Sequence, residues 1–287
     1  MTKYILPDKT LLDKKSEEIE EIDEYYNLSK ILLQKDINNP DKKLEIYIGR
    51  NKDKEKYNID LKETSGLFVA GETGSGKSVF LDSLIITLLY KNTPEELNFL
   101  LIDPNKIELI NYNGIPHLLE EVSTTKQQVL ISLKKISDII QERIKILQEE
   151  HITNIETYNK KIINQFPHIV IIIDESTTLM EEEKIKGLLE EILIKGQKLG
   201  VHLILATSAY LAKDFDKDFL KLFKHRLTFD LASKEQATLI NLKDSNWLNV
   251  SGEIMINTQK ENRYQAPYIS TEEINRVVDF IKNQNNN

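Results

Sequence analysis

Short runs of apolar residues recur along the chain from Leu44 onwards. The first run alternates apolar and polar residues. The others are nearly continuous, as in strands that are buried on both faces of a parallel sheet. Strands are therefore predicted over 44–49 (LEIYIG), 66–71 (GLFVAG), 98–103 (NFLLID), 168–175 (HIVIIIDE) and 201–208 (VHLILATS).

Longer segments with helical periodicity lie between these runs. The clearest is 129–150, where apolar residues at steps of three and four form one face of an amphipathic helix. Helices are also predicted over 79–90, over 185–200 and over 272–284, the last behind a capping box made by Ser270 and Glu273. Because strands alternate with helices of this length, we expect an α/β fold whose mostly parallel sheet is covered by helices on both faces.

Residues 1–42 differ in character from the rest of the chain. They carry the acidic run SEEIEEIDEYY (16–26), followed by LSKILLQ (28–34) and then by Asn39 and Pro40. This pattern predicts a short helical N-terminal appendage, which is either solvated or a docking element for a partner. We expect residues 43–287 to form one domain, because the sequence contains neither a repeat nor a long linker.

Composition and charge narrow the classes of protein. The chain has 287 residues and no cysteine, which excludes disulfides, thiolate metal sites and cysteine nucleophiles. It has 38 basic and 46 acidic residues, which argues against a protein that binds nucleic acid with its whole surface. Binding through a local basic patch stays compatible with this charge. The N-terminus lacks the pattern of a signal peptide, and no apolar run approaches the length of a membrane helix. We therefore expect a cytoplasmic protein.

Three of the ten glycines fall within six residues. They belong to a G-x-x-x-x-G-K-S motif between a predicted strand and a predicted helix. In such a loop, backbone N–H groups and the helix N-terminus face the phosphates of a nucleotide. We therefore predict an ATP site in which Lys77 reaches the β- and γ-phosphates and Ser78 ligates Mg²⁺. The predicted loop consists of Gly71, Glu72, Thr73, Gly74, Ser75, Gly76, Lys77 and Ser78.

Acidic and hydroxyl residues end the later strands. Asp174 can hold the metal ion, and Glu175 beside it can orient and deprotonate an attacking water, which favours ATP hydrolysis. Thr207 and Ser208 end the next strand, either as a sensor of the γ-phosphate or simply as a strand end. Asp103 can support the same site or cap its own loop.

The stretch 67–119 closely resembles the motor domain of the FtsK/SpoIIIE DNA translocases. The likeness includes its IDP strand end, its ELxxYxGIPHLL sequence and the DE motif at 174–175, and it extends to 4–13, 49–61 and 268–284. The resemblance implies a RecA-like P-loop ATPase that assembles as a hexameric ring around double-stranded DNA and moves the DNA with ATP. No counterpart of the family's membrane segment or winged helix is present, which suggests a stand-alone motor or an excised motor core.

Several positions depart from the family pattern. The usual ATQRP reads ATSAY here, so Ser208 stands in place of the sensor glutamine, and Gln197 and Thr238 stand where arginines are usual. Arg143 and Arg226 fall where the family tends to have arginine. They are candidates to act on the site of a neighbouring subunit, a role worth about 10³–10⁵ in rate where it has been dissected.

Three functions therefore stay open. The first is a DNA-translocating ATPase, whose DNA contacts would come from lysines in 210–226, although the same lysines also suit a solvated face. The second is a related ATPase that moves protein, as in secretion systems. The third is a nucleotide-binding structural subunit whose hydrolysis has decayed. The lysines in question are Lys213, Lys217, Lys221 and Lys224.

Overall fold

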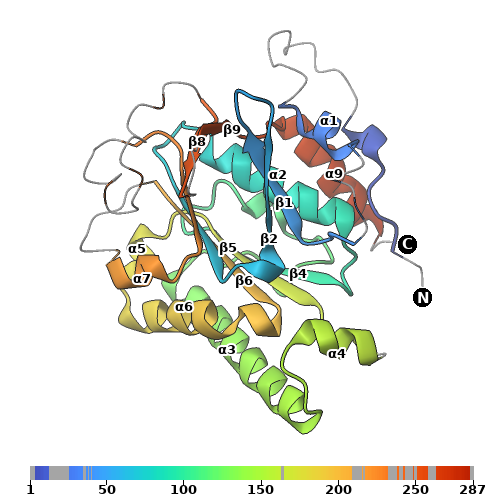
Figure 1. Ribbon diagram of the computed structural model, residues 1–287, viewed down its shortest axis with the longest axis vertical. Helices are drawn as coiled ribbons and strands as arrows, with labels where there is room; N and C mark the ends of the chain where they lie inside the picture. Colours follow the sequence, from blue (N-terminus) through green and yellow to red (C-terminus); the bar gives the residue numbers. More distant parts are fainter. Residues whose placement is uncertain are drawn as a thin grey trace.

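A nine-stranded sheet runs through the centre of the computed structural model, with strand order β2-β1-β9-β8-β7-β3-β6-β5-β4 (Figure 1). The structure describes residues 4–12, 26–34, 37, 39, 41–162, 165–208, 215, 217–231, 238, 242, 248, 251–257 and 263–284. The strands are β1 (Glu45–Arg50), β2 (Lys56–Asp60), β3 (Gly66–Ala70), β4 (Leu97–Ile102), β5 (His168–Ile173), β6 (Val201–Thr207), β7 (His225–Thr228), β8 (Glu253–Ile256) and β9 (Arg263–Gln265).

The sheet has a parallel part and an antiparallel part. Strands β7, β3, β6, β5 and β4 pair in parallel, and this block confirms the predicted α/β fold. Strands β8, β9, β1 and β2 continue the sheet with antiparallel pairs, which makes the whole sheet mixed. In the parallel block β6 lies between β3 and β5, so the ends of these three strands meet at one edge.

Helices cover both faces of the sheet, as the sequence predicts. Along β3, Leu67 and Val69 face a core that includes residues of α2 and α9, while Phe68 and Ala70 face a second core with α3 and α6. In Figure 1 the first pair of helices lies above the parallel strands β4, β5 and β6, and the second pair lies below them. The helices are α1 (Leu28–Leu32), α2 (Lys77–Lys91), α3 (Lys126–Glu149), α4 (Ile155–Lys161), α5 (Thr177–Met180), α6 (Glu183–Lys195), α7 (Lys217–Lys221) and α9 (Thr271–Asn283).

Local sequence explains where the amphipathic helices α3 and α9 begin. The Thr125 hydroxyl caps α3 together with Gln128, and the predicted capping box of Ser270 and Glu273 is present at the start of α9. Helix α2 is buried around most of its circumference, because the sheet covers one side and α9 packs on another. None of the helices in the described part of the chain combines the length and the apolar character that crossing a bilayer requires.

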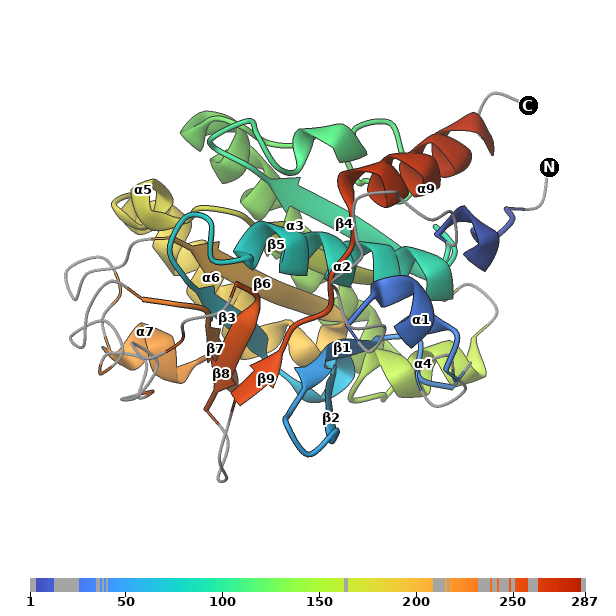
Figure 2. The ribbon, with the colours of Figure 1, turned by 90° about the horizontal axis from the view of Figure 1, so that it is seen from above.

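The described part of residues 1–42 packs against the C-terminal helix. The Leu28 N–H donates to the Tyr268 carbonyl at 2.9 Å, and Arg276 on α9 donates to the Leu11 carbonyl at 2.7 Å. Figure 2 shows this N-terminal part beside α9. Leu28 and Ile31 of α1 are each 1 % exposed and share the core with α2. The acidic run falls mostly outside the described residues, and the boundary at residue 42 stays a prediction.

Candidate functional site

The loop that joins β3 to α2 carries the G-x-x-x-x-G-K-S motif and is tied to neighbouring segments through its backbone. The Glu72 N–H donates to the Asp230 carbonyl at 2.9 Å, and the Gly252 N–H donates to the Ser75 carbonyl at 2.9 Å. These bonds fix the loop on either side of its exposed residues 73 and 74. The backbone of the loop is therefore both fixed in position and exposed to solvent.

Two glycines of this loop have backbone angles that other residues seldom adopt. The φ angles of Gly74 and Gly76 are +83° and +103°. A Cβ atom at Gly76 would also lie 3.0 Å from the Gly252 nitrogen. Helix α2 begins at the next residue, and the first N–H groups of a helix have no acceptor within it. The conformation thus leaves N–H donors and a helix N-terminus at the loop, a combination that binds phosphate.

Lys77 and Asp174 meet across the sheet edge. The Lys77 ammonium lies 3.1 Å from Asp174 Oδ1, and the two side chains are 8 % and 6 % exposed. Burial raises the pKa of the Asp174 carboxyl, the Lys77 ammonium lowers it, and the charges of Asp103 and Glu175 raise it further. A bound γ-phosphate would offer Lys77 a negative partner, and a metal ion would offer Asp174 a positive one. Each side chain would therefore keep a partner of opposite charge.

The side-chain oxygens in and beside the loop are of the kind that ligates magnesium. Ser78 lies in the first turn of α2 with its side chain partly exposed, and Asp174 supplies a carboxylate. Magnesium in nucleotide sites is held by one or two protein oxygens, by waters and by the phosphates of the substrate. The described residues contain no group of three or more His, Cys, Asp or Glu side chains that could hold a metal ion.

Glu175 follows Asp174 and is held by hydrogen bonds on both carboxylate oxygens. Oε2 accepts the Ser208 N–H at 3.0 Å and also the Ser208 hydroxyl, and Oε1 accepts the Thr177 hydroxyl at 2.7 Å. Burial by itself would raise the pKa of Glu175, but the bonds from Ser208 and Thr177 outweigh it and leave the pKa below its ordinary value. Glu175 is therefore a carboxylate at neutral pH, the form that can accept a proton from water.

The sequence-predicted sensor residues touch Glu175 in this structure. Thr207 is fully buried at the end of β6, and its hydroxyl lies 2.8 Å from that of Thr177. Asp103 has a different partner, because its buried carboxylate accepts five backbone N–H groups, from residues 105–109. Of the two roles left open for Asp103, the loop cap is thus present, and its charge also acts on the pKa of Asp174.

Arg143 lies inside the protein. It is 4 % exposed on α3, donates to the Leu199 carbonyl at 2.5 Å and the Pro167 carbonyl at 2.7 Å, and lies over the Phe166 ring. Burial lowers the pKa of Arg143 to about 10. A guanidinium held in this way is not available to a neighbouring subunit, so its placement argues against the trans-acting role expected from its position in the sequence.

Replacing Arg143 with methionine is expected to lower the free energy of unfolding by about 2–4 kcal/mol, because two carbonyls lose a charged donor. Urea denaturation measures this change. Lys145→Met is the matched control on the same helix, since the Lys145 side chain is 77 % exposed. If Arg143→Met were as stable as the unsubstituted chain, and its ATPase activity per subunit no longer rose with protein concentration, the result would support the trans-acting role of Arg143.

The other candidate residues lie outside the loop after β3 and have partners or exposures of their own. Arg226 on β7 is half-buried and donates to the Leu220 carbonyl at 3.0 Å, and Gln197 donates to the Lys62 carbonyl at 3.0 Å. Thr238 is exposed. Among the lysines of 210–226, Lys221 pairs with Asp218 at 2.8 Å, Lys224 donates to the Glu63 carbonyl at 2.8 Å, Lys217 is exposed at the start of α7, and Lys213 lies outside the described residues.

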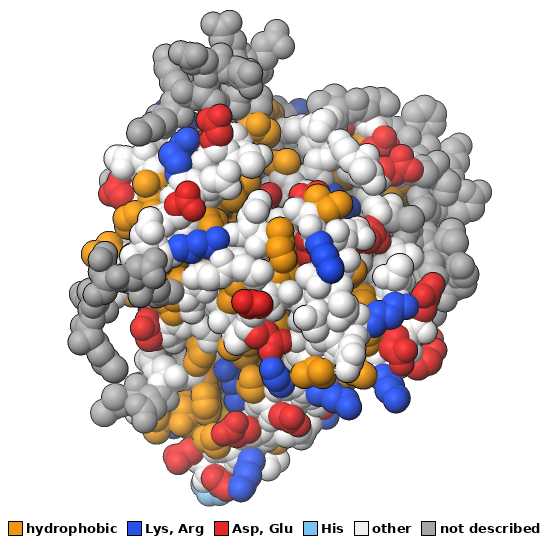
Figure 3. Space-filling model, turned by 180° about the vertical axis from the view of Figure 1, so that it is seen from behind, with side chains coloured by type: hydrophobic (Ala, Val, Ile, Leu, Met, Phe, Trp, Pro, Cys, Tyr) orange, Lys and Arg blue, Asp and Glu red, His pale blue; other side chains and the backbone are white. Residues whose placement is uncertain are grey.

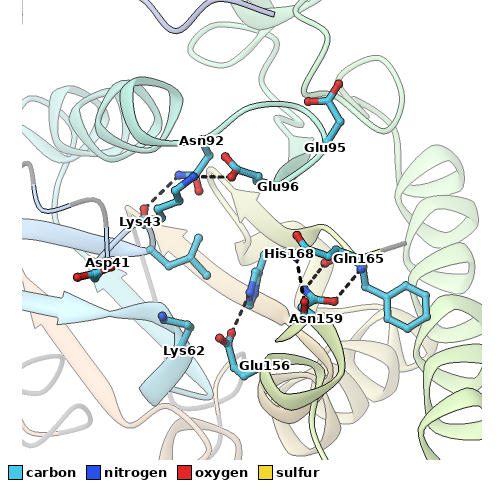
Figure 4. A pocket seen from close by; sticks show the side chains of 12 residues that line it. Asp41, Lys43, Lys62, Asn92, Glu95, Glu96, Glu156, Asn159, Gln165 and His168 are labelled. Atoms are coloured by element: carbon cyan, nitrogen blue, oxygen red, sulfur yellow. Dashed lines mark hydrogen bonds and ion pairs between the residues drawn. The ribbon is translucent and has the colours of Figure 1, made fainter. Parts of the chain in front are cut away.

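A polar cavity of about 180 Å³ lies at the opposite edge of the sheet, where β4 and β5 begin (Figure 4). Lys43 pairs there with Glu96, and His168 Nε2 lies 3.0 Å from Glu156 Oε1. Ligands of parallel sheets bind at the carboxyl ends of the strands, which is the other edge. The charged side chains of this cavity already pair with one another, and the cavity lies at the edge of the sheet away from the carboxyl ends of the strands. We therefore assign the candidate site to the loop after β3 and not to this cavity.

The sequence profile of the FtsK/SpoIIIE family matches residues 27–214, well over half of the chain. The chain belongs to the FtsK/SpoIIIE family. A DNA translocase FtsK from Clostridium acetobutylicum is 32 % identical over 268 residues, which cover 90 % of this chain and 35 % of that protein. A DNA translocase FtsK from Lactococcus lactis is 33 % identical over 264 residues, covering 86 % and 35 %. This FtsK/SpoIIIE chain thus spans about a third of the length of these relatives.

Solved structures share the fold of this FtsK/SpoIIIE domain. The pCW3 conjugation coupling protein TcpA, in a monomer form with ATPγS, superposes with a TM-score of 0.76 at 20 % identity and covers 91 % of this chain and 75 % of its own. The cytoplasmic domain of the type VII secretion ATPase EccC from Thermomonospora curvata gives 0.72 at 23 % identity, covering 84 % and 31 %. The chain is thus a P-loop ATPase domain by sequence family and by fold.

Proposed function

We propose that this domain binds Mg²⁺-ATP at Gly71–Ser78 and hydrolyses it to move double-stranded DNA through a ring of six identical subunits, the number that the family resemblance implies. One observation carries the enzymatic part. Lys77 and Asp174 lie 3.1 Å apart in a buried pair, and the carboxylate of Glu175 is fixed beside them. Phosphate binding, metal binding and activation of water thus come from three adjacent side chains.

Each group has a separate task in this proposal. Lys77 and the loop N–H groups neutralise the phosphates. Ser78 with Asp174 would hold Mg²⁺, which would supply positive charge that stabilises the negative charge developing on the phosphate. Glu175 accepts a proton from the attacking water. Thr207 and Ser208, which end β6 beside this carboxylate, connect the state of the site to the sheet.

Double-stranded DNA is the favoured cargo because the relatives that match most of the chain are named DNA translocases. On the face shown in Figure 3, acidic and basic side chains are interspersed among the described residues, so DNA contacts are expected from a few loops and not from this face. ATP and DNA meet in the cytoplasm, where we place the protein. We assign residues 43–287 to the motor and residues 1–42 to a helical appendage.

The shared-site ring predicts that ATPase activity per subunit rises with protein concentration and rises further with duplex DNA. A site that a neighbour completes exists only in the assembled fraction, and DNA that threads the ring increases this fraction. Steady-state hydrolysis over a wide concentration range, with and without duplex DNA, measures the effect. With Arg143 buried, the neighbour's positive charge is expected from Arg226 or from a nearby lysine such as the exposed Lys198.

Two outcomes of this series contradict parts of the proposal. Activity per subunit that stays constant in both series rejects the shared site. Tight ATP binding without turnover favours the structural subunit, which the substitutions at Gln197, Ser208 and Thr238 already suggest.

A protein cargo is the second alternative, since the EccC secretion ATPase has the same fold. Salt-sensitive, sequence-tolerant binding of duplex DNA separates the DNA translocase from it.

A further inference from the structure

Glu175 has a strained backbone conformation directly after β5. Its φ angle is +62°, in the left-handed region that residues other than glycine seldom adopt. Such a conformation persists at functional sites only where the surrounding contacts fix it. The hydrogen bonds of the Glu175 side chain therefore identify the residues that determine where this carboxylate lies.

The two carboxylate oxygens are held differently. Oε2 accepts the N–H and the hydroxyl of Ser208, so both of its lone pairs are used. Oε1 has one short bond, from the Thr177 hydroxyl at 2.7 Å. The Thr177 N–H also points to Oε1, but at 3.4 Å it is a weak donor, and the Thr207 hydroxyl oxygen lies 3.4 Å away. Oε1 thus keeps one lone pair that can accept a hydrogen bond from water.

The direction of the Thr177 hydroxyl follows from its two neighbours. Its oxygen lies 2.7 Å from Glu175 Oε1 and 2.8 Å from the Thr207 hydroxyl oxygen. A hydroxyl carries a single proton, and a carboxylate can only accept, so Thr177 donates to Glu175 and accepts from Thr207. Because Thr207 is fully buried on β6, Thr177 connects the carboxylate to a rigid strand.

We propose that Thr177 is a positioning residue for hydrolysis, whose hydroxyl fixes Oε1 of Glu175 while Ser208 fixes Oε2. This inference rests on the proposed function, in which Glu175 activates the water. A carboxylate clamped at both oxygens holds one lone pair in a constant direction, and orientation of this kind contributes strongly to rate. Serine at 208 fits the same purpose, because its short side chain reaches Glu175 directly from the end of β6.

The first test compares substitutions of matched size. Thr177→Val keeps the shape and removes the hydroxyl, Thr177→Ser keeps the hydroxyl, and Thr178→Val makes the same change at an exposed neighbour. Thr177→Val is expected to lower kcat about tenfold, as loss of a charged hydrogen bond predicts, with KM and ATPγS affinity unchanged. Thr177→Ser should restore most of kcat, and Thr178→Val should leave it unaltered. An unchanged or increased kcat for Thr177→Val overturns the proposal.

The second test asks whether Thr177 acts through Glu175. In a Glu175→Ala background, measured by single-turnover hydrolysis, Thr177→Val should have no further effect, and the same tenfold loss there overturns the proposal. If the unsubstituted chain binds ATP but does not hydrolyse it, the proposed function fails separately. In that case the unfolding equilibrium constants of four proteins decide: the unsubstituted chain, Thr177→Val, Glu175→Ala and the double variant. If the effects of the two substitutions on stability are non-additive, they support the clamp on Glu175, and if they are additive, they reject it.

Discussion

Replacing Lys77 with alanine abolishes nucleotide binding and, with it, turnover. The side chain is expected to give at least two charged hydrogen bonds to phosphate oxygens, each worth about 1.5–3 kcal/mol, so the affinity should fall about a hundredfold or more. Titration with a fluorescent ATP analogue measures the affinity, and steady-state hydrolysis measures the turnover. This is the largest effect that we expect from a single substitution, because the affinity and every later step depend on the same contact.

Two controls separate binding from folding in this experiment. Lys77 is also one half of a buried ion pair with Asp174, and removal of one partner of such a pair destabilises a protein. Circular dichroism and the unfolding midpoint must therefore show that Lys77→Ala is folded under the assay conditions. Lys126→Ala removes a lysine that is half-exposed on α3 and should bind ATP normally. Unchanged affinity and turnover in folded Lys77→Ala would contradict the assignment of the loop.

Glu175→Gln is expected to retain ATP and to lose its hydrolysis. The amide cannot accept the proton of the attacking water, while Lys77 and the loop still hold the phosphates, so kcat should fall about 10²–10⁴-fold with little change in affinity. Single-turnover hydrolysis and nucleotide titration measure the two quantities on one preparation. Glu181→Gln, at a residue whose side chain is 62 % exposed beyond α5, is the matched control and should leave both quantities unchanged.

The pattern of affinity across the two variants distinguishes the roles of the residues. If Glu175→Gln lost ATP affinity as completely as Lys77→Ala, then Glu175 would serve binding or structure and not the water. The hydrogen bonds from Ser208 and Thr177 explain why a structural role deserves this test, since they fix a residue with a left-handed backbone. Retained affinity with lost turnover is the result that supports a base.

Local sequence determined the elements of the parallel block and the loop between them. The apolar runs that become β3, β4, β5 and β6 are long enough to be recognised singly, and the helical periodicity of α3 and α9 is strong. Strands β7, β8 and β9 were not predicted, because each has only three or four residues and becomes a strand through pairing with its neighbours. The family was recognisable from the GIPHLL stretch and the P-loop together.

The sequence by itself also predicted which residues of the candidate site carry chemistry, from the glycine-rich loop before a helix and the acids that follow a strand. Only the tertiary structure decided how they meet. Lys77 and Asp174 are 97 residues apart in the chain, and β6 brings Thr207 and Ser208 to Glu175. The same packing buries Arg143 and brings the Thr207 hydroxyl to that of Thr177, which is itself a local neighbour of Glu175. Periodicity and spacing report contacts along one element, whereas contacts between elements depend on the order of strands in the sheet.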